Sequence, residues 1–305
     1  MSRRRSHWSL IAVGAAVLMV CTRAWAGGPP AQKLPSALLV FPLIQAGGDQ
    51  DTRIELLNLS GNAQSIQCFY VGSGCGEIGF TVFLTAYQPM AWLASAGWND
   101  PLTGTSVPPF FGAGELKCGV VPPLPEVAFH NTIQGRATIF SSSTGATISY
   151  GAVGFQRLSD GDYTGVFSLD GSTYAQCPNK LHFNVLTDQP TSASQIVLVP
   201  CTEDLFFQIP TAVTVQIFIY NEFEQGFSTS YGFTCFDERL LSEISSALTR
   251  AVAGTDTAHL VVRGVGGPVL GLVIDQVPFQ GTTGTAGNEP SFDGGSSATV
   301  TFPSL

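Results

Sequence analysis

The sequence predicts an all-β fold made of two tandem immunoglobulin-like β-sandwich domains that arose by internal duplication. The first observation is a repeat: segment 38–69 returns in the same order at 196–236, and segment 135–156 returns at 258–276. The second is that short alternating runs are separated by Gly, Pro, Asn, Asp and Ser, as in sandwiches and barrels. Self-similarity at this scale predicts two related units.

The repeated segments have the character of strands and turns. In the second copy, Val215, Ile217 and Ile219 alternate with polar and aromatic residues, which is the period of a half-buried strand. The matched runs are Leu38–Pro42 with Ile196–Pro200, Ile54–Asn58 with Val215–Asn221, and Ile66–Phe69 with Phe233–Phe236. The repeat therefore predicts an architecture and indicates no activity.

The repeat also predicts the domain boundaries. We expect the first sandwich to span residues 37–193, with an aromatic- and proline-rich insertion over 76–130, and the second to span 194–305. Apolar residues at helical spacing predict one short helix near 237–251, and residues 281–298 are expected to form a Gly-, Ser- and Thr-rich loop before a last edge strand. A single larger sandwich that fuses both halves is the alternative, because the second copy is short.

The first 26 residues have the three parts of a secretory signal peptide. Arg3–Arg5 provide the charged start, Ile11–Val20 the apolar stretch and Ala24–Ala26 the small-residue cleavage site. The apolar stretch is shorter than the roughly 20 residues that cross a bilayer. We therefore expect the chain to be secreted, to the periplasm or the exterior, with no membrane span after cleavage and an extended leader over residues 27–36.

Two other export signals fit less well. A twin-arginine signal favours apolar residues soon after the arginine pair, where Ser6 and His7 stand. A lipoprotein would be anchored through Cys21, but Val20 occupies the position where a small residue is expected. A Sec-type signal is therefore the prediction.

The chain is acidic and unusually apolar for an exported protein. Its formal charge is −9, with 11% charged residues and a mean hydropathy of +0.24. Without the four arginines of residues 1–26, nine basic residues stand against 22 acidic ones, a formal charge of −13. This balance argues against nucleic acid and anionic lipid as partners, because both require a positive patch. The apolar composition favours self-association or docking onto a partner.

Six cysteines follow the signal peptide, and an even number favours disulfides in an exported chain. Cys201 is expected to pair with Cys235, because the two flank the central strand pair of the second copy. Six cysteines allow fifteen connectivities. Zinc is not expected, because the chain has no Cys-x-x-Cys pair and no histidine at ligand spacing from a cysteine. The other expected disulfides are Cys68 with Cys75 and Cys118 with Cys177.

The candidate ligand-binding residues lie in the insertion. Trp92 and Trp98 are the two tryptophans outside the signal peptide, and Phe110 and Phe111 follow them. Exposed aromatic rings match the apolar face of a pyranose, so these four rings are candidates for binding carbohydrate. The alternative is that they pack the insertion onto the first sandwich. Trp98 has the more turn-like setting and is the ring expected to be exposed.

No catalytic motif and no cofactor is indicated. The chain has no His-Glu-x-x-His, no Gly-x-Ser-x-Gly and no phosphate-binding Gly-x-x-x-x-Gly-Lys. Glu222 and Glu224 alternate onto one face of a strand end, so an acidic pair of the glycosidase type is an alternative. No metal site is expected, since paired aspartates such as Asp49 and Asp51 offer too few of the roughly six to eight oxygens that calcium takes.

Five short motifs mark strands, turns and cysteines: Val40–Pro42, Asp51–Thr52, Cys68–Tyr70, Gly114–Cys118 and Val199–Leu205. Together they resemble a group of secreted bacterial proteins with tandem β-sandwich repeats. The similarity would cover most of the chain after the signal peptide. No activity is attached to this group, so the resemblance implies an exported β protein and assigns no site residue.

The sequence therefore predicts an exported, non-catalytic structural or binding module of the cell envelope or exterior. Its partner would be a second copy of the chain, a cell-surface protein or a polysaccharide. Two alternatives remain: a carbohydrate-binding module that uses the Trp-bearing insertion, and a secreted glycan hydrolase that uses an acidic pair.

Overall fold

The computed structural model describes residues 34–101, 104–121, 131–159, 165–279 and 282–303. The protein is all-β, with 65% strand and 4% helix. The predicted signal peptide and most of the predicted leader lie outside the described residues. Within the described ranges, no helix has the length and apolar character needed to cross a membrane.

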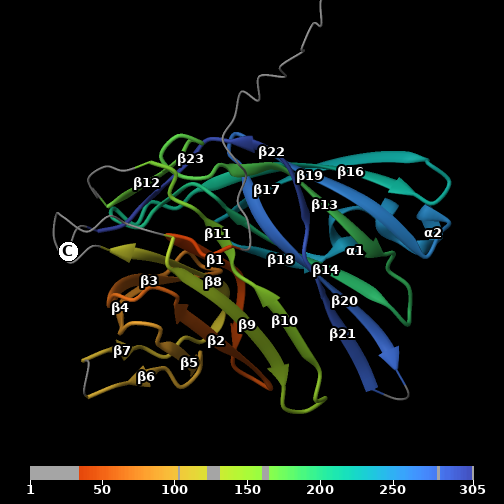
Figure 1. Ribbon diagram of the computed structural model, residues 1–305. Helices are drawn as coiled ribbons and strands as arrows, with labels where there is room; N and C mark the ends of the chain where they lie inside the picture. Colours follow the sequence, from red (N-terminus) through yellow and green to blue (C-terminus); the bar gives the residue numbers. More distant parts are fainter. Residues whose placement is uncertain (1–33, 102–103, 122–130, 160–164, 280–281, 304–305) are drawn as a thin grey trace, which may run out of the picture.

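The strands form five sheets and one two-stranded ribbon (Figure 1). Sheet I has the order β11 (Val153–Phe155), β1 (Leu38–Ala46), β8 (Gly112–Val121), β3 (Gln64–Gly72), β4 (Glu77–Leu84). Sheet II has the order β10 (Thr147–Gly151), β9 (Ile133–Ser141), β2 (Gln50–Asn58), β5 (Pro89–Leu93). The ribbon pairs β6 (Trp98–Asn99) with β7 (Ser106–Val107).

The remaining three sheets draw mainly on the second half of the chain. Sheet III has the order β12 (Val166–Leu169), β23 (Ala298–Thr301), β15 (Glu203–Asp204). Sheet IV has the order β17 (Gly226–Thr234), β16 (Ala212–Asn221), β19 (Thr257–Val265), β13 (Cys177–Leu186), β22 (Ser291–Ser296). Sheet V has the order β18 (Asp237–Leu240), β14 (Ala193–Pro200), β20 (Val269–Phe279), β21 (Thr282–Asn288).

The prediction of two tandem immunoglobulin-like sandwich domains is wrong, because the five small sheets are arranged as the blades of a β-propeller. Sheets I and II pack against each other through β1 on β2 and β9, and sheets IV and V do so through β13 on β20. Their strand orders are mostly non-consecutive, unlike the up-and-down blades of a regular propeller.

Two pairings show why the chain does not separate into tandem units. Strand β13 precedes residue 193, yet it hydrogen-bonds to β19 and β22 in the middle of sheet IV. Sheet III combines β12, β15 and β23, which come from three distant parts of the chain. Alternation along a segment specifies a strand, but the partners of that strand are set by packing over long sequence distances.

The segments that the repeat matched nevertheless form comparable ladders. Strand β2 pairs antiparallel with β9, and its counterpart β16 pairs antiparallel with β19. Likewise β1 pairs with β11, and its counterpart β14 pairs with β20. The internal repeat thus describes individual strand pairs, while the sandwich architecture inferred from it is overturned.

The core is continuous between the two halves of the chain. One hydrophobic cluster contains Phe41 and Tyr70 of sheet I together with Leu272 of sheet V and Phe302 near the C-terminus. A second cluster lies between sheets IV and V. Gly119 on β8 is needed for this packing, since a Cβ there would lie 2.4 Å from the ring of Phe167.

Two further predictions about local structure are corrected. Residues 237–251 do not form a single helix, because β18 (Asp237–Leu240) pairs with β14 before the short turns α1 (Leu241–Ile244), η1 (Ser246–Leu248) and α2 (Arg250–Ala253). The predicted loop at 281–298 contains β21 and β22. The last strand, β23, lies between two strands and is not an edge.

The six cysteines after residue 26 all form disulfides, but none of the three expected pairings occurs. The disulfides join Cys68 to Cys118, Cys75 to Cys235 and Cys177 to Cys201. The expected Cys68–Cys75, Cys118–Cys177 and Cys201–Cys235 are therefore wrong. Cys68 and Cys118 lie directly opposite each other on β3 and β8, a register that cannot be read from their 50-residue separation. The Cys75–Cys235 bond joins the two halves of the chain across 160 residues.

Candidate functional site

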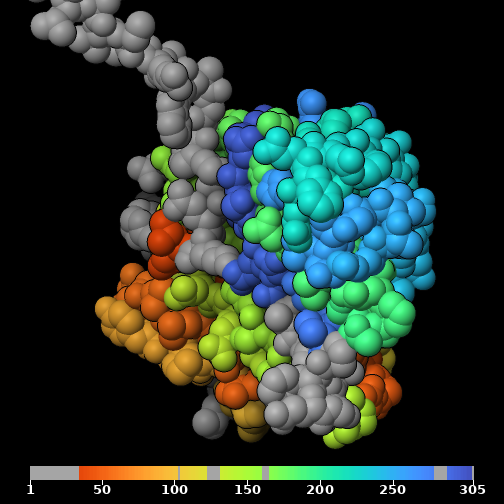
Figure 2. Space-filling view, turned by 90° about the vertical axis from the view of Figure 1, so that its right-hand side faces the viewer, coloured from red at the N-terminus to blue at the C-terminus, as the bar shows by residue number. Residues whose placement is uncertain are grey.

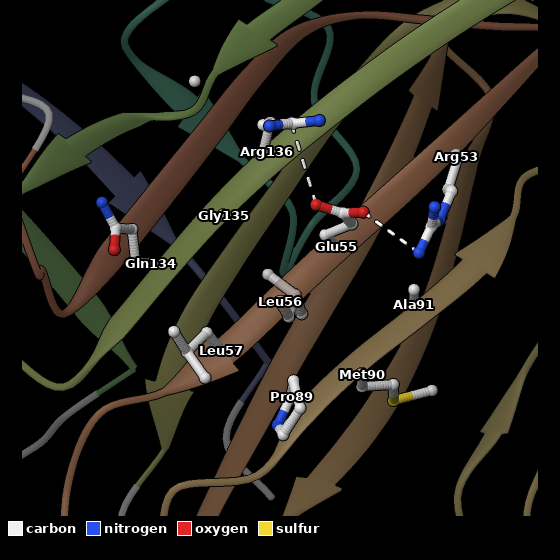
Figure 3. Close-up of a pocket in the computed structure, with 11 residues that line it drawn as sticks. Arg53, Glu55, Leu56, Leu57, Pro89, Met90, Ala91, Gln134, Gly135 and Arg136 are labelled. Atoms are coloured by element: carbon white, nitrogen blue, oxygen red, sulfur yellow. Dashed lines mark ion pairs between the residues drawn. The ribbon is translucent and has the colours of Figure 1, made fainter.

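A hollow of about 690 Å³ lies on the outer face of sheet II (Figure 3). Alternation along β2 produces this face: Ile54 and Leu56 point into the core, while Arg53 and Glu55 point away from it. Strand β9 adds Arg136 beside them. The hollow is lined by Arg53, Glu55, Leu56, Leu57, Pro89, Met90, Ala91, Gln134, Gly135, Arg136 and Gly151.

One carboxylate lies between two guanidinium groups in this hollow. Glu55 is directly opposite Arg136 in the β2–β9 ladder, and an ion pair of 3.8 Å joins their side chains. On its other side, Glu55 lies 3.2 Å from Arg53 (Figure 3). Exposed pairs of this kind contribute little to stability. The two arginines and one glutamate together carry one net positive charge, in a chain whose formal charge is −9. A ligand in the hollow would meet their side chains as a row of hydrogen-bonding groups.

A second hollow of about 190 Å³ adjoins the first. It is lined by Phe83, Gln88, Pro89, Met90, Ala91, Trp98, Asp100 and Thr105. Pro89, Met90 and Ala91 on edge strand β5 belong to both hollows. The two hollows therefore adjoin at β5, with the charged groups of sheet II on one side and an aromatic wall formed by Phe83 and Trp98 on the other.

Trp98 is held at this wall by the β6–β7 ribbon. The ribbon pairs Trp98 with Val107, and Asp100 N donates to Thr105 O at 2.8 Å to close the turn. Gly97 before it has φ +64°, and a Cβ there would lie 2.2 Å from the carbonyl oxygen of Val107. Only glycine fits this close approach. The ring remains 46% exposed beside the smaller hollow.

The four aromatic candidates divide into two buried and two exposed rings. Trp92 donates from Nε1 to the hydroxyl of Tyr70 at 2.7 Å, and Phe110 stacks on the Tyr70 ring with centroids 4.8 Å apart. Both are core residues and cannot meet a ligand. Trp98 is exposed, as its turn-like setting predicts, and lines a hollow. Phe111 is exposed but lines neither hollow.

Sequence reasoning missed most residues of the site. Arg53 and Glu55 could have been found as the outward positions of an alternating strand. Arg136 could not, because only the β2–β9 register brings it opposite Glu55. Phe83 on β4 and Gln88 just before β5 likewise join the site only through the fold of the segment from β4 to β7.

The proposed acidic pair is not gathered into a cleft. Glu222 and Glu224 lie exposed in the turn between β16 and β17, where Glu222 accepts a hydrogen bond from Thr257 Oγ1 at 2.7 Å. Neither lines the hollows described above. Among the described residues, no three His, Cys, Asp or Glu side chains are grouped to hold a metal ion.

A buried ionic cluster lies elsewhere, between sheets I and III. Lys117 on β8 lies 2.8 Å from Glu115 and also contacts Glu203 on β15, with all three side chains at most 3% exposed. Burial raises the pKa of Glu115. Burial would lower the pKa of Lys117, but the two carboxylates more than offset this and raise it. The cluster lines neither hollow. Its ion pairs connect β8 of sheet I to β15 of sheet III.

Glu77 on β4 lies near this cluster and has a raised pKa. Burial, together with the Glu203 carboxylate and against the opposing charge of Lys117, raises the pKa of Glu77 from 4.5 to about 7. The folded chain holds this proton more tightly than the unfolded chain. The contribution of Glu77 to the free energy of unfolding is therefore fully present below the unfolded-chain pKa of 4.5, and it is lost as pH rises through the folded-chain pKa of about 7. We expect a loss of about 1 kcal/mol between pH 5 and pH 8, discounted because solvent screens a partly exposed carboxyl.

Urea unfolding across this pH range measures the effect, and Glu77→Gln is expected to flatten the slope. Glu224→Gln, which alters an exposed turn carboxylate, serves as the control. An unchanged slope in Glu77→Gln would assign the pH dependence to another group.

No protein-family model matches the sequence, and a search of curated proteins finds no relative.

Proposed function

We propose that the protein is an exported, non-catalytic binding module that binds carbohydrate across the two adjoining hollows. The observation that carries this proposal is Trp98, a ring 46% exposed at the wall of a hollow that continues onto a polar sheet face. Export is supported by the three disulfides and by the signal-like residues 1–26.

The chemistry of the lining residues suits a sugar. A flat indole offers an apolar surface to the C–H face of a pyranose, and Phe83 adds a second ring, 39% exposed. Gln88 and Asp100 lie beside these rings, where they can bind hydroxyl groups. Arg53 and the groups around it extend the hydrogen-bonding surface beyond β5.

A binding role fits the site better than hydrolysis. Glycosidases place two carboxylates on either side of one bond. Here each hollow contains one carboxylate, Glu55 in the larger and Asp100 in the smaller, and Glu55 is already paired with arginines.

Trp98→Ala is expected to weaken retention on polysaccharide about tenfold, which corresponds to the roughly 1.4 kcal/mol of one stacked ring. The melting temperature should stay unchanged because the ring is exposed. Affinity electrophoresis in gels containing single polysaccharides, with a thermal melt of each variant, measures both quantities.

Two matched substitutions sharpen this test. Phe111→Ala removes a ring that is 68% exposed but lines neither hollow, and it should leave retention unchanged. Trp92→Ala removes a buried ring and should lower stability by about 3–5 kcal/mol. If Trp98→Ala and Phe111→Ala bind every polysaccharide as the wild type does, the carbohydrate site is not at Trp98.

A further inference from the structure

Strand β17 forms an outer edge of sheet IV, and its sequence lacks the features that normally protect an edge. Among the described residues it hydrogen-bonds to β16 alone, in an unbroken register from Ala212↔Thr234 to Tyr220↔Gly226. Its nine residues include no charged residue and no proline. A long, regular edge of this kind presents a free row of N–H and C=O groups to another strand.

Among the described residues, the other edge strands of five or more residues are protected. Strand β4 begins with Glu77, β5 begins with Pro89, and β22 carries Asp293. The uncharged edges β10 and β21 lie against each other. Strand β17 is thus a long edge that has neither a charge nor a covering strand within the described structure.

The two faces of β17 differ, which fixes how a partner strand would be oriented. Phe227, Tyr231 and Phe233 point toward the core between sheets IV and V. The outward positions carry only glycine, serine and threonine. In Figure 2 the hairpin of β16 and β17, in cyan, forms the upper right of the molecular surface. A strand added here would continue both an aromatic inner face and a flat outer face.

The sequence of β17 is complementary to itself. In an antiparallel pair centred on Ser230, Phe227 of one strand faces Phe233 of the other, and Thr229 faces Tyr231. Ser230 faces its own copy, and the other outward positions pair glycine with serine or threonine. Aromatic and β-branched cross-strand pairs stabilise a sheet, and no like charges meet in this register.

We propose that two copies of this chain associate through β17, antiparallel about Ser230, so that their two five-stranded sheets become one of ten strands. Two chains of formal charge −9 repel each other, and β17 adds no charge of its own to this repulsion. Asp237 and Arg239, which contact Tyr231, form an ion pair with each other. A two-fold axis also requires a surface that matches itself, and β17 meets this requirement. The proposed contact involves no residue of the proposed carbohydrate site, because β17 lines neither hollow.

Sedimentation velocity of the purified chain over a wide concentration range tests the proposal. The wild type should convert from monomer to dimer as concentration rises. Ser230→Lys, which brings two lysines together at the two-fold axis, should raise the dimer dissociation constant at least tenfold, as expected from about 1.4 kcal/mol of like-charge repulsion. Thr214→Lys is the control, because it adds the same charge to the outer face of β16, one strand inside the edge.

A charge-swap experiment identifies the interface directly. Ser230→Lys and Ser230→Glu should each be monomeric at concentrations where the wild type is dimeric, and an equal mixture of the two should recover the dimer. A wild type that stays monomeric at every concentration would overturn the assignment of a second copy. A dimer that Ser230→Lys leaves as intact as Thr214→Lys does would also overturn it.

Discussion

Replacing Lys117 with methionine is expected to lower the free energy of unfolding by about 3–5 kcal/mol, because it removes the one cation of a buried cluster. Glu115 and Glu203 would then face each other without compensation, and both are at most 3% exposed. Neither oxygen of Glu115 has a hydrogen bond of favourable geometry in the described structure, so its charge depends on Lys117. Urea unfolding followed by circular dichroism measures the change.

The matched control removes the carboxylates as well. A triple variant with Glu115→Gln, Lys117→Met and Glu203→Gln should recover at least half of the lost stability, because no unpaired charge stays buried. If Lys117→Met is as stable as the wild type, the ion pairs of Lys117 do not stabilise the contact between sheets I and III.

Removing the Cys75–Cys235 disulfide, by changing both residues to serine, is expected to cost about 4–5 kcal/mol. In the chain-entropy account, a longer closed loop restricts the unfolded chain more, and this disulfide closes 160 residues. It also links the turn after β3 to the segment before β18, so the two halves of the chain lose a covalent connection. Denaturant unfolding under non-reducing conditions gives the difference.

The Cys68–Cys118 disulfide provides the comparison within one sheet. It closes 50 residues between paired strands, so its removal should cost about 1 kcal/mol less than removal of Cys75–Cys235. If the variant without Cys68–Cys118 were the less stable of the two, local packing around the disulfide would contribute more to stability than the loop-closure entropy of the unfolded chain.

The sequence by itself determined the strands of the repeated segments and the character of their two faces. Alternation at Val215, Ile217 and Ile219 predicts a half-buried strand, and β16 has that burial pattern over Ala212–Asn221. The turn-like setting of Trp98 predicted an exposed ring, and the ring is exposed. These features follow from residues within a few positions of each other, and such local preferences can be read directly from the sequence.

Only the tertiary structure decided which strands pair, and this is where the sequence-based predictions failed. Cys68 faces Cys118 because β3 lies beside β8, and β23 is inserted between β12 and β15. The site depends on the same kind of contact, since Arg136 reaches Glu55 through the β2–β9 register. Pairing between distant strands is selected by the total burial of apolar surface in one continuous core. Because this burial depends on the whole chain at once, it cannot be read from any single segment.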